Sequence, residues 1–276
     1  MNIIEYMIEE DIGFGDITTD ALVPKDLTVK AQIISKESGI IAGVEIIKEI
    51  FSLKQIKFES FFNDGDNIKN KDIIFKIEGN AKDILKIERT ILNLMMRMSG
   101  IATITHNIVK QVRTINSKVK IAGTRKTMPT LAKFDKIAIN IGGGDSHRFR
   151  LDDLVLIKDN HIAAVGSIIK SIELAKKNVS FSKKIEIEVN SIDDLILATN
   201  NGVDIVMLDN MSINEINDGI YRLNDLNLRN KVLIEVSGGI NPENIMEYAK
   251  TDVDIISLGA LTHSVKSLDL SLNINF

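Results

Sequence analysis

Three short segments between residues 123 and 161 carry basic side chains of interest for binding. The region contains GTRKT, GGGDSHR and LVLIKDNH, which supply Arg125, Lys126, His147, Arg148 and Lys158. The whole chain carries a formal net charge of -4, so its overall field does not attract a highly negative ligand. A local group of guanidinium and ammonium side chains can do so, because they donate charge-assisted hydrogen bonds to carboxylate and phosphate oxygens. The spacing therefore predicts a pocket for a small polyanion.

Composition narrows the class of protein. The chain has 276 residues, of which 44% are hydrophobic, enough to bury a core in one large or two small domains. It has no cysteine, which excludes disulfides and thiolate-bound metals and leaves Mg²⁺ as the expected metal. Lysines are dispersed among acidic residues, so we expect no nucleic-acid partner. The acidic start of the chain and the lack of a long apolar run predict no membrane partner and a cytoplasmic location.

The spacing of apolar residues changes from a strand-like to a helical pattern near residue 83. Before that point, residues 30–35 and 72–78 have the character of strands, and Asn63-Asp64-Gly65-Asp66 is a turn signal. A long helical stretch then runs to about residue 115, with Gly100 as an interruption. We therefore expect a sheet with helices in the first part of the chain.

Six short β-branched runs and four helical segments alternate beyond residue 115. The runs cover residues 119–122, 154–157, 185–189, 205–208, 232–236 and 254–258, and the helical segments cover 163–177, 192–200, 213–223 and 242–249. Crossovers of this length connect parallel strands, so the pattern predicts an open or incomplete α/β barrel. The closing SLDLSLNINF alternates with period two and is expected to return to the first sheet.

The carboxyl ends of barrel strands form the ligand-binding face. Polar residues and glycines follow five of the six runs, as Thr124-Arg125-Lys126, Lys158-Asp159-Asn160-His161, Asp209-Asn210, Ser237-Gly238-Gly239 and Gly259-Ala260. In the remaining run Glu186 and Glu188 share one face, so at least one carboxylate should point into the barrel mouth. Glycines at the last two strand ends let backbone N–H groups approach a phosphate, helped by a helix expected to begin near Asn241-Pro242.

Each candidate also has an ordinary structural explanation. Lys158 can be a solvated lysine or pair with Asp152 or Asp153, and SGGI can be a plain β-to-α turn. His147 can be a hydrogen-bonded turn histidine, and arginine at positions 89 and 97 is typical of an exposed helix surface. Cations, acids and glycines at the same end of successive strands nevertheless favour a binding site.

Eight segments resemble, in order and spacing, the quinolinate phosphoribosyltransferases, also called carboxylating nicotinate-nucleotide pyrophosphorylases. The segments are EDIGFGDITTDALVP, ERTILNLMMRMSGIAT, GTRKTMP, GGGDSHRFRLDDLVLIKDNHI, IEIEVNSIDDL, GVDIVMLDNMS, IEVSGGINPENI and VDIISLGALTHS. The segment TMPT departs from the family, which more often has threonine and glycine at the positions of Met128 and Thr130. The resemblance spans nearly the whole chain.

The resemblance implies a fold, a reaction and an assembly. The fold is a mixed α/β amino-terminal domain, residues 1–105 with 264–276 returning to it, packed on an open α/β barrel, residues 106–263. The reaction joins quinolinate to 5-phosphoribosyl 1-pyrophosphate (PRPP) and yields nicotinate mononucleotide, carbon dioxide and pyrophosphate, a step of de novo NAD biosynthesis. The assembly is a homodimer, with or without further association, in which Arg89 reaches the partner's active site.

The same resemblance assigns roles to residues of the barrel. It places the quinolinate and PRPP contacts on Thr124, Arg125, Lys126, His147, Arg148 and Lys158, the ribose and Mg²⁺ on Glu188 and Asp209, and the 5′-phosphate on Ser237, Gly238, Gly239, Gly259 and Ala260. The expected catalytic residues are Lys126, Lys158, Glu188 and Asp209. Planar arginine forks suit the two adjacent carboxylates of quinolinate, and a lysine beside Mg²⁺ suits a departing pyrophosphate.

Three other functions compete with this interpretation. A related pyrophosphorylase-like transferase would act on a different acid or base. A barrel lyase or aldolase would use Lys158 as a Schiff-base nucleophile. A phosphate-metabolite sensor would need only the cradle between Ser237 and Gly259, and the presence of both Glu188 and Asp209 argues against it.

Overall fold

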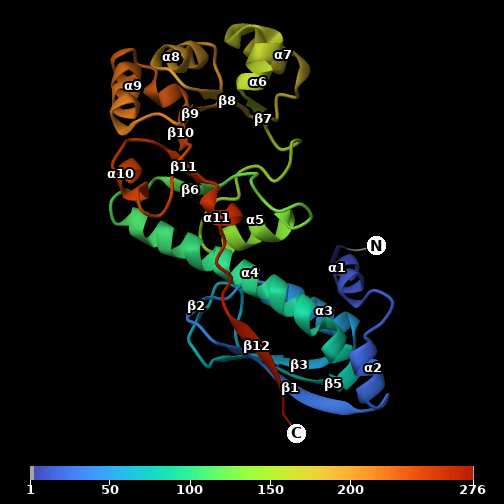
Figure 1. Cartoon of the computed structure of the whole chain (residues 1–276). Coiled ribbons are helices and arrows are strands. Elements are labelled where there is room, and N and C mark those ends of the chain that lie inside the picture. The colour runs from blue at the N-terminus through green and yellow to red at the C-terminus, as the bar shows by residue number, and fades with distance from the viewer. Residues whose placement is uncertain (1–2, 276) are drawn as a thin grey trace. The chain divides into compact units, whose positions relative to one another are not determined.

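Two units make up the chain in the computed structural model, which describes residues 3–275 (Figure 1). The first unit comprises the described parts of Met1–His106, Met128–Gly143 and Val265–Phe276, and the second comprises Asn107–Thr127 and Gly144–Ser264. The segment 128–143, which the domain prediction assigned to the barrel, thus belongs to the first unit.

A four-stranded antiparallel sheet is the centre of the first unit. Its strand order is β12-β1-β5-β3, with β1 (Thr28–Ser35), β3 (Lys57–Ser60), β5 (Ile73–Asn80) and β12 (Leu270–Asn275). The alternation in β1 buries Val29, Ala31 and Ile33 on one face. The end of the chain returns to this sheet, since β12 pairs with β1 along its whole length (Figure 1). A separate pair consists of β2 (Gly39–Ile40) and β4 (Asn67–Ile68).

Helix α4 (Ala81–Arg113) runs for 33 residues without a break, so the expected interruption at Gly100 is wrong. A Cβ atom at Gly100 would collide with the backbone carbonyl of Lys266, which explains why glycine stands there. The chain passes from the first unit into the second within this helix. The other helices of the first unit are α1 (Ile3–Ile12), α2 (Ile17–Leu22), α3 (Val44–Leu53) and α5 (Ala132–Ile141).

A buried ion pair ties α4 to α5 within the first unit. Arg97 Nε and Nη2 donate to the two carboxylate oxygens of Asp135, each at 2.8 Å, and the Asp135 side chain is fully buried. Because removal of one partner would leave a buried charge uncompensated, this pair is a structural element. Arg97 is therefore not the exposed helix arginine that its sequence context suggested.

Six parallel strands form the second unit's sheet, in the order β6-β11-β10-β9-β8-β7. The sheet leaves β6 and β7 as its edges, so the barrel is open. This confirms the predicted fold class, a mixed α/β fold with an open barrel of parallel strands. The bounds are β6 (Lys120–Gly123), β7 (Val155–Ile157), β8 (Ile185–Val189), β9 (Ile205–Asp209), β10 (Leu233–Ser237) and β11 (Ile255–Leu258).

Helices α6 to α9 pack in sequence beside the strands of the second unit (Figure 1). Two helical expectations need correction. The segment 163–177 is not one helix. One helix ends at Val165, where Gly166 adopts φ +86°, and a second begins at Ile168, where Ser167 is the N-cap. The helix expected from Pro242 begins at Ile245, because the Asn241 side chain holds the preceding turn through the N–H groups of Glu243 and Asn244. The helices are α6 (Asp159–Val165), α7 (Ile168–Asn178), α8 (Ile192–Asn200), α9 (Ile213–Asp225), η1 (Arg229–Lys231), α10 (Ile245–Ala249) and α11 (Ala260–His263).

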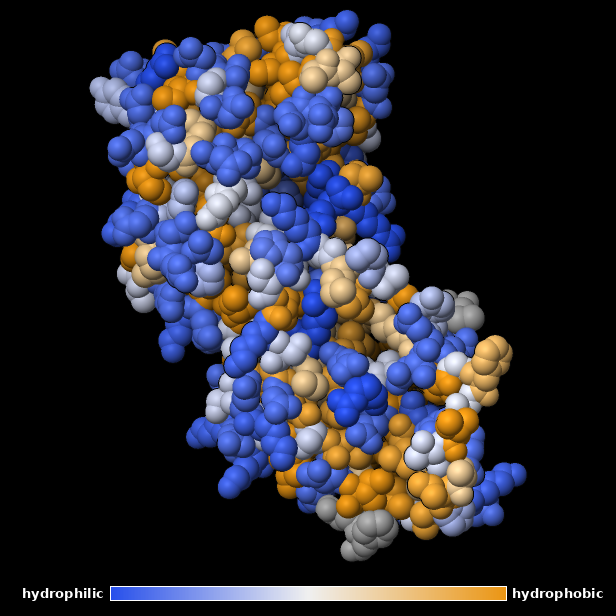
Figure 2. Space-filling view, viewed as in Figure 1, coloured by the Kyte–Doolittle hydropathy of each residue, from blue (hydrophilic) through white to orange (hydrophobic). Residues whose placement is uncertain are grey.

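The surface carries both hydrophilic and hydrophobic residues, and Figure 2 shows hydrophobic residues gathered on part of the first unit. Large apolar side chains are exposed on and between α1 and α2, namely Tyr6, Phe14, Ile17 and Leu22. No helix in the described part of the chain has both the length and the apolar composition needed to cross a membrane.

Thr130 adopts φ +68°, a left-handed conformation that is rare for a β-branched residue. This is the position where the resembling family more often has glycine, which adopts positive φ without a steric penalty. The Thr130 hydroxyl donates to the carbonyl of Pro129 at 2.6 Å. The departure in TMPT therefore places backbone strain in the loop before α5.

We predict that Thr130→Gly stabilises the protein by about 1 kcal/mol, because the left-handed penalty of about 1–2 kcal/mol exceeds the entropic cost of glycine. Urea unfolding of the variant and the wild type measures this difference. Thr130→Ala is the matched control, since it removes the hydroxyl and the branch but keeps the Cβ atom, and it should gain less. Equal stabilisation by both substitutions would show that the Cβ atom causes no strain.

Candidate active site

The parallel register places the predicted site residues of the second unit at one edge of its sheet. Leu258 of β11 pairs with Gly123 of β6, and Ser237 of β10 pairs with Asp209 of β9. The segments after β6, β9, β10 and β11 therefore begin at the same level. They carry Thr124, Arg125, Lys126, Asp209, Ser237, Gly238, Gly239, Gly259 and Ala260.

Lys126 lies beside the end of β11. Its backbone carbonyl accepts a hydrogen bond from Thr262 Oγ1 at 2.8 Å, and its backbone N–H donates to Thr124 Oγ1 at 3.1 Å. A Cβ atom at Gly259 would lie 3.1 Å from the Lys126 side chain and 2.9 Å from the ring of His263. Because residue 259 is a glycine, there is room beside it for the Lys126 side chain. Lys126 itself is exposed to solvent.

Lys158 is paired with Glu188 across neighbouring strands, not with Asp152 or Asp153. Its Nζ atom lies 2.5 Å from Glu188 Oε2, and the two side chains follow the register pair Ile157 and Ile187. They are 42% and 16% exposed, so the ion pair remains open to solvent and to ligands. The Lys158 backbone N–H donates to His161 Nδ1 at 3.0 Å, which caps the start of α6. His161 is therefore structural.

The ends of β9 and β10 fit closely together. Asn210 has φ +55°, its backbone N–H donates to the Ser237 carbonyl at 3.0 Å, and its amide donates to Asp209 Oδ2 at 2.6 Å. A Cβ atom at Gly238, where φ is +91°, would collide with the Asn210 side chain. Gly239 has φ +62° and open space beside it. Glycine is thus required at position 238, whereas at Gly239 the left-handed φ favours glycine and the backbone is exposed.

Arg148 is a buried cation with another cation nearby. Its side chain is 8% exposed, and no carboxylate in the described part of the chain lies within ion-pair distance of it. Burial lowers the pKa of Arg148, and the positive charge of Arg125 lowers it further. The negative charges of Glu186 and Asp153 oppose this effect, each by less than Arg125 contributes. Arg148 is therefore a buried guanidinium group within electrostatic range of a second cation.

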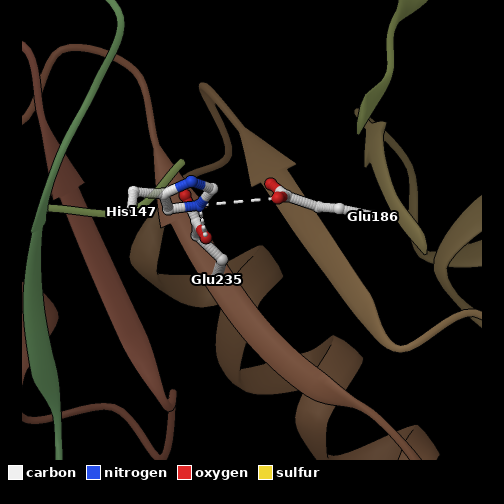
Figure 3. Close-up of side chains that lie close together, drawn as sticks. All are labelled: His147, Glu186 and Glu235. Atoms are coloured by element: carbon white, nitrogen blue, oxygen red, sulfur yellow. Dashed lines mark hydrogen bonds and ion pairs between the residues drawn. The ribbon is translucent and has the colours of Figure 1, made fainter. Parts of the chain in front are cut away.

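Beneath these cations, two glutamates and a histidine meet inside the barrel (Figure 3). His147 Nε2 lies 2.9 Å from Glu235 Oε2 and 3.4 Å from Glu186 Oε2, and both glutamates are fully buried. Glu235 Oε1 also accepts a hydrogen bond from Ser257 Oγ at 2.5 Å. The sequence analysis did not single out Glu235 or Ser257, although a glutamate within the apolar run IEVS is the same signal that drew attention to Glu186.

Burial raises the pKa of Glu186 to about 8, and the neighbouring Glu235 contributes in the same direction. The positive charges of Arg148 and Lys158 oppose the shift, so Glu186 is within electrostatic range of both. Neither carboxylate oxygen of Glu186 has a hydrogen-bond partner among the residues that the structure describes. Glu186 is therefore a buried carboxyl group that interacts electrostatically with cations from two different segments, Arg148 and Lys158.

Comparison with known proteins shows the family of the chain. Residues 16–99 match the model for the quinolinate phosphoribosyl transferase N-terminal domain, and residues 101–273 match the model for the C-terminal domain. The chain belongs to the quinolinate phosphoribosyl transferase family. It is 48% identical to a probable carboxylating nicotinate-nucleotide pyrophosphorylase of Methanothermobacter thermautotrophicus, over 99% of this chain and 98% of that protein. It is 37% identical to the Mycobacterium leprae nicotinate-nucleotide pyrophosphorylase, over 98% of this chain and 95% of that one.

The likeness extends to solved structures. The nicotinate-nucleotide pyrophosphorylase of Ehrlichia chaffeensis superimposes with a TM-score of 0.92 at 39% identity, covering 99% of this chain and 97% of that one. The fold of this chain is therefore that of the solved structure along almost its whole length. Arg89 belongs to the first unit, where it is exposed on α4.

Oxygen ligands suited to a hard cation lie at the ends of β8 and β9. Glu188 and Asp209 each keep a partly exposed carboxylate there. Mg²⁺ prefers one or two carboxylates together with water and substrate phosphates, and this donor set fits that preference. The buried group of His147, Glu186 and Glu235 fits it less well, because it includes an imidazole and has no access for several waters.

We predict that Glu186→Gln changes the pH dependence of stability. Between its ordinary pKa of 4.5 and the raised value of about 8, the folded protein keeps a proton that the unfolded chain has lost. The contribution of Glu186 is thus full below the lower value and is lost as pH rises toward the higher one, by about 1.4 kcal/mol for each pH unit. A neutral glutamine removes this slope, so the variant should gain stability over the wild type as pH rises, as urea unfolding can measure. Glu243→Gln controls for the loss of an exposed carboxyl group, and parallel curves for Glu186→Gln and wild type would contradict the prediction.

Proposed function

We propose that this protein transfers the phosphoribosyl group of PRPP to quinolinate and releases carbon dioxide and pyrophosphate, giving nicotinate mononucleotide for NAD biosynthesis. Membership of the quinolinate phosphoribosyl transferase family supports the reaction class. The observation that carries the substrate assignment is Arg148, a buried cation within electrostatic range of Arg125 and without an ion-pair partner among the described residues. A rigid ligand with two adjacent carboxylates supplies the missing negative charge.

In this proposal, Arg125 and Arg148 hold the carboxylates of quinolinate. Guanidinium groups donate paired hydrogen bonds in a fixed plane, so two of them fix the orientation of an aromatic ring as well as its charge. Orientation is important because the ring nitrogen must approach the anomeric carbon of the ribose in line with the departing pyrophosphate. Fixed geometry of this kind contributes up to roughly 7–11 kcal/mol in favourable cases.

The opposite side of the proposed site receives PRPP. The exposed backbone at Gly239 and the segment at Gly259 and Ala260 bind the 5′-phosphate, together with Ser237 and Gly238. Glu188 and Asp209 bind the ribose hydroxyl groups. Lys126 and Lys158 face the pyrophosphate, and Lys158 can exchange its contact with Glu188 for a phosphate oxygen because that ion pair is partly exposed. A lysine paired in this way is not a free nucleophile, which argues against Schiff-base chemistry.

Bond changes in the proposed reaction balance without an oxidant. The bond between the anomeric carbon and pyrophosphate breaks, and the ring nitrogen forms a new bond to that carbon. The nitrogen becomes positively charged, which stabilises the ring carbanion left when the adjacent carboxylate departs as carbon dioxide. A proton then replaces the carboxylate. Mg²⁺ held by Glu188 and Asp209 would offset the negative charge of the leaving pyrophosphate.

The proposal includes a homodimer in which Arg89 completes the partner's site. Two features support it: Arg89 is exposed on α4, and the apolar side chains Tyr6, Phe14, Ile17 and Leu22 are exposed on the same unit. Exposed apolar groups of this size are common at subunit interfaces. Cytoplasmic location remains a prediction from the sequence.

We expect the purified protein with Mg²⁺, PRPP and quinolinate to form nicotinate mononucleotide with one carbon dioxide per turnover, measured by chromatography and gas release. Turnover of another base but not of quinolinate would transfer the assignment to a related transferase.

Arg125→Ala should raise the KM for quinolinate roughly 10- to 100-fold, the loss expected for hydrogen bonds between charged groups, with little change in the KM for PRPP. Equal losses for both substrates would contradict the role of Arg125.

The shared site predicts complementation between inactive subunits. Arg89→Ala and Lys158→Ala proteins should each be inactive alone. A mixed dimer should regain part of the activity, because one of its two sites contains neither substitution. Differently tagged subunits allow heterodimers to be isolated before assay. Isolated heterodimers without activity would show that Arg89 does not act across the interface.

A further inference from the structure

Both backbone polar groups of His147 and both of its ring nitrogens have contacts within the protein. Its backbone N–H donates to Asp145 Oδ1 at 2.7 Å, and Ser146 Oγ donates to its carbonyl at 3.2 Å. Its ring Nδ1 accepts the backbone N–H of Arg148 at 2.9 Å, and its ring Nε2 contacts Glu235 Oε2 at 2.9 Å. The backbone is left-handed, with φ +52°, and the side chain is 10% exposed.

These contacts determine where the ring carries its proton. A nitrogen that accepts an N–H donor must present a lone pair, so Nδ1 is unprotonated. The contact between Nε2 and a carboxylate oxygen then requires the proton on Nε2, which donates to Glu235. A ring with one protonated nitrogen is neutral. His147 therefore has neither a positive charge nor a remaining ring nitrogen with which to bind a substrate carboxylate.

We propose that His147 is a positioning residue: as the neutral Nε2–H tautomer it links the Arg148 backbone to Glu235 inside the barrel, and so holds the Arg148 guanidinium in place. This role replaces the direct substrate contact that the family resemblance suggested for His147, and it rests on the proposed function only for the identity of the ligand. Glu235 is in turn fixed by Ser257 of the neighbouring strand β11. The linkage runs from two barrel strands through one imidazole to the main chain of Arg148.

Arg148 needs such support because no ion pair among the described residues holds its guanidinium group. It lies close enough to Arg125 for repulsion, and it has no ion-pair partner among residues 3–275. The hydrogen bond from the Arg148 N–H to His147 fixes the main chain and hence the direction of the Cα–Cβ bond. Burial of Arg148 then limits the rotamers that remain from that starting direction.

NMR of the protein labelled with ¹⁵N tests the tautomer directly. The chain has four histidines, and the signals that disappear in His147→Asn identify the ring of His147. We expect one protonated and one unprotonated ring nitrogen, with the proton on Nε2. A doubly protonated ring, a proton on Nδ1, or a metal ion bound at Nε2 would overturn the proposal.

Two substitutions of Glu235 separate hydrogen bonding from charge. Glu235→Gln removes the negative charge but keeps a carbonyl that accepts the Nε2 proton, whereas Glu235→Ala removes both. The Arg148 Nε–H signal should remain ordered in Glu235→Gln and become mobile in Glu235→Ala. If both variants lose order to the same extent, His147 depends on the charge of Glu235 and the proposal fails.

A double-mutant cycle tests whether His147 acts through Arg148. Phthalate, a ring with two adjacent carboxylates and no nitrogen, serves as the probe, and titration calorimetry gives its Kd. His147→Ala should weaken binding roughly tenfold in the wild-type background and by less than about twofold in Arg148→Ala, because residues that act as a unit are not additive. Glu235→Gln should bind within about threefold of wild type and Glu235→Ala should resemble His147→Ala. Additive losses in the cycle would show that His147 touches the ligand itself.

The two readouts keep this proposal separate from the proposed function. Phthalate that does not bind the wild type would count against a dicarboxylate site and hence against quinolinate as substrate. The ring tautomer and the order of Arg148 are measured without ligand and decide the role of His147 in either case.

Discussion

Burial of charged groups inside one small barrel is the constraint on which the second unit depends. Glu186 and Glu235 are fully buried and Arg148 is nearly so. An isolated ion in such surroundings costs several kcal/mol, so each group must find a partner, take up a proton or attract a ligand. The three groups use three different solutions: Glu235 has hydrogen bonds from His147 and Ser257, Glu186 favours its protonated form, and Arg148 remains available to an anion.

Burial also separates two ion pairs that look alike in a list of contacts. Arg97 and Asp135 form a bidentate pair with one partner fully buried, so its loss would leave a charge without water or counter-ion. Lys158 and Glu188 form a pair in which the lysine is 42% exposed. An exposed pair contributes little to stability, so a phosphate or metal ion can replace either partner at small cost. The first pair is suited to hold helices together, and the second to exchange partners during a reaction.

The sequence predicted which residues lie at the strand ends better than it predicted the contacts between distant segments. The position of Asp209, Ser237 and Gly259 followed from counting strands, because parallel strands bring their carboxyl ends to one edge. The roles of Glu235 and Gly100 did not follow, since each depends on a segment distant in sequence: Glu235 faces His147, and Gly100 faces Lys266. A local sequence pattern indicates which residues lie within a helix or strand and which lie at its end. It does not indicate which distant segment packs against that helix or strand in the fold.

Left-handed backbone occurs at the strand ends of the second unit as well as in other turns of the chain. His147, Asn210, Gly238 and Gly239 have positive φ in the segments around the strand ends, whereas Thr130 has it in the first unit. His147 and Asn210 are held by hydrogen bonds: the His147 N–H bonds to Asp145, and the Asn210 amide bonds to Asp209. Strained conformations persist only where surrounding contacts hold them. The hydrogen bond that holds Asn210 also holds Asp209, whereas Arg148 is fixed by a second hydrogen bond of His147, from the Arg148 N–H to the ring Nδ1. The two left-handed residues are therefore also the residues that hold Asp209 and Arg148.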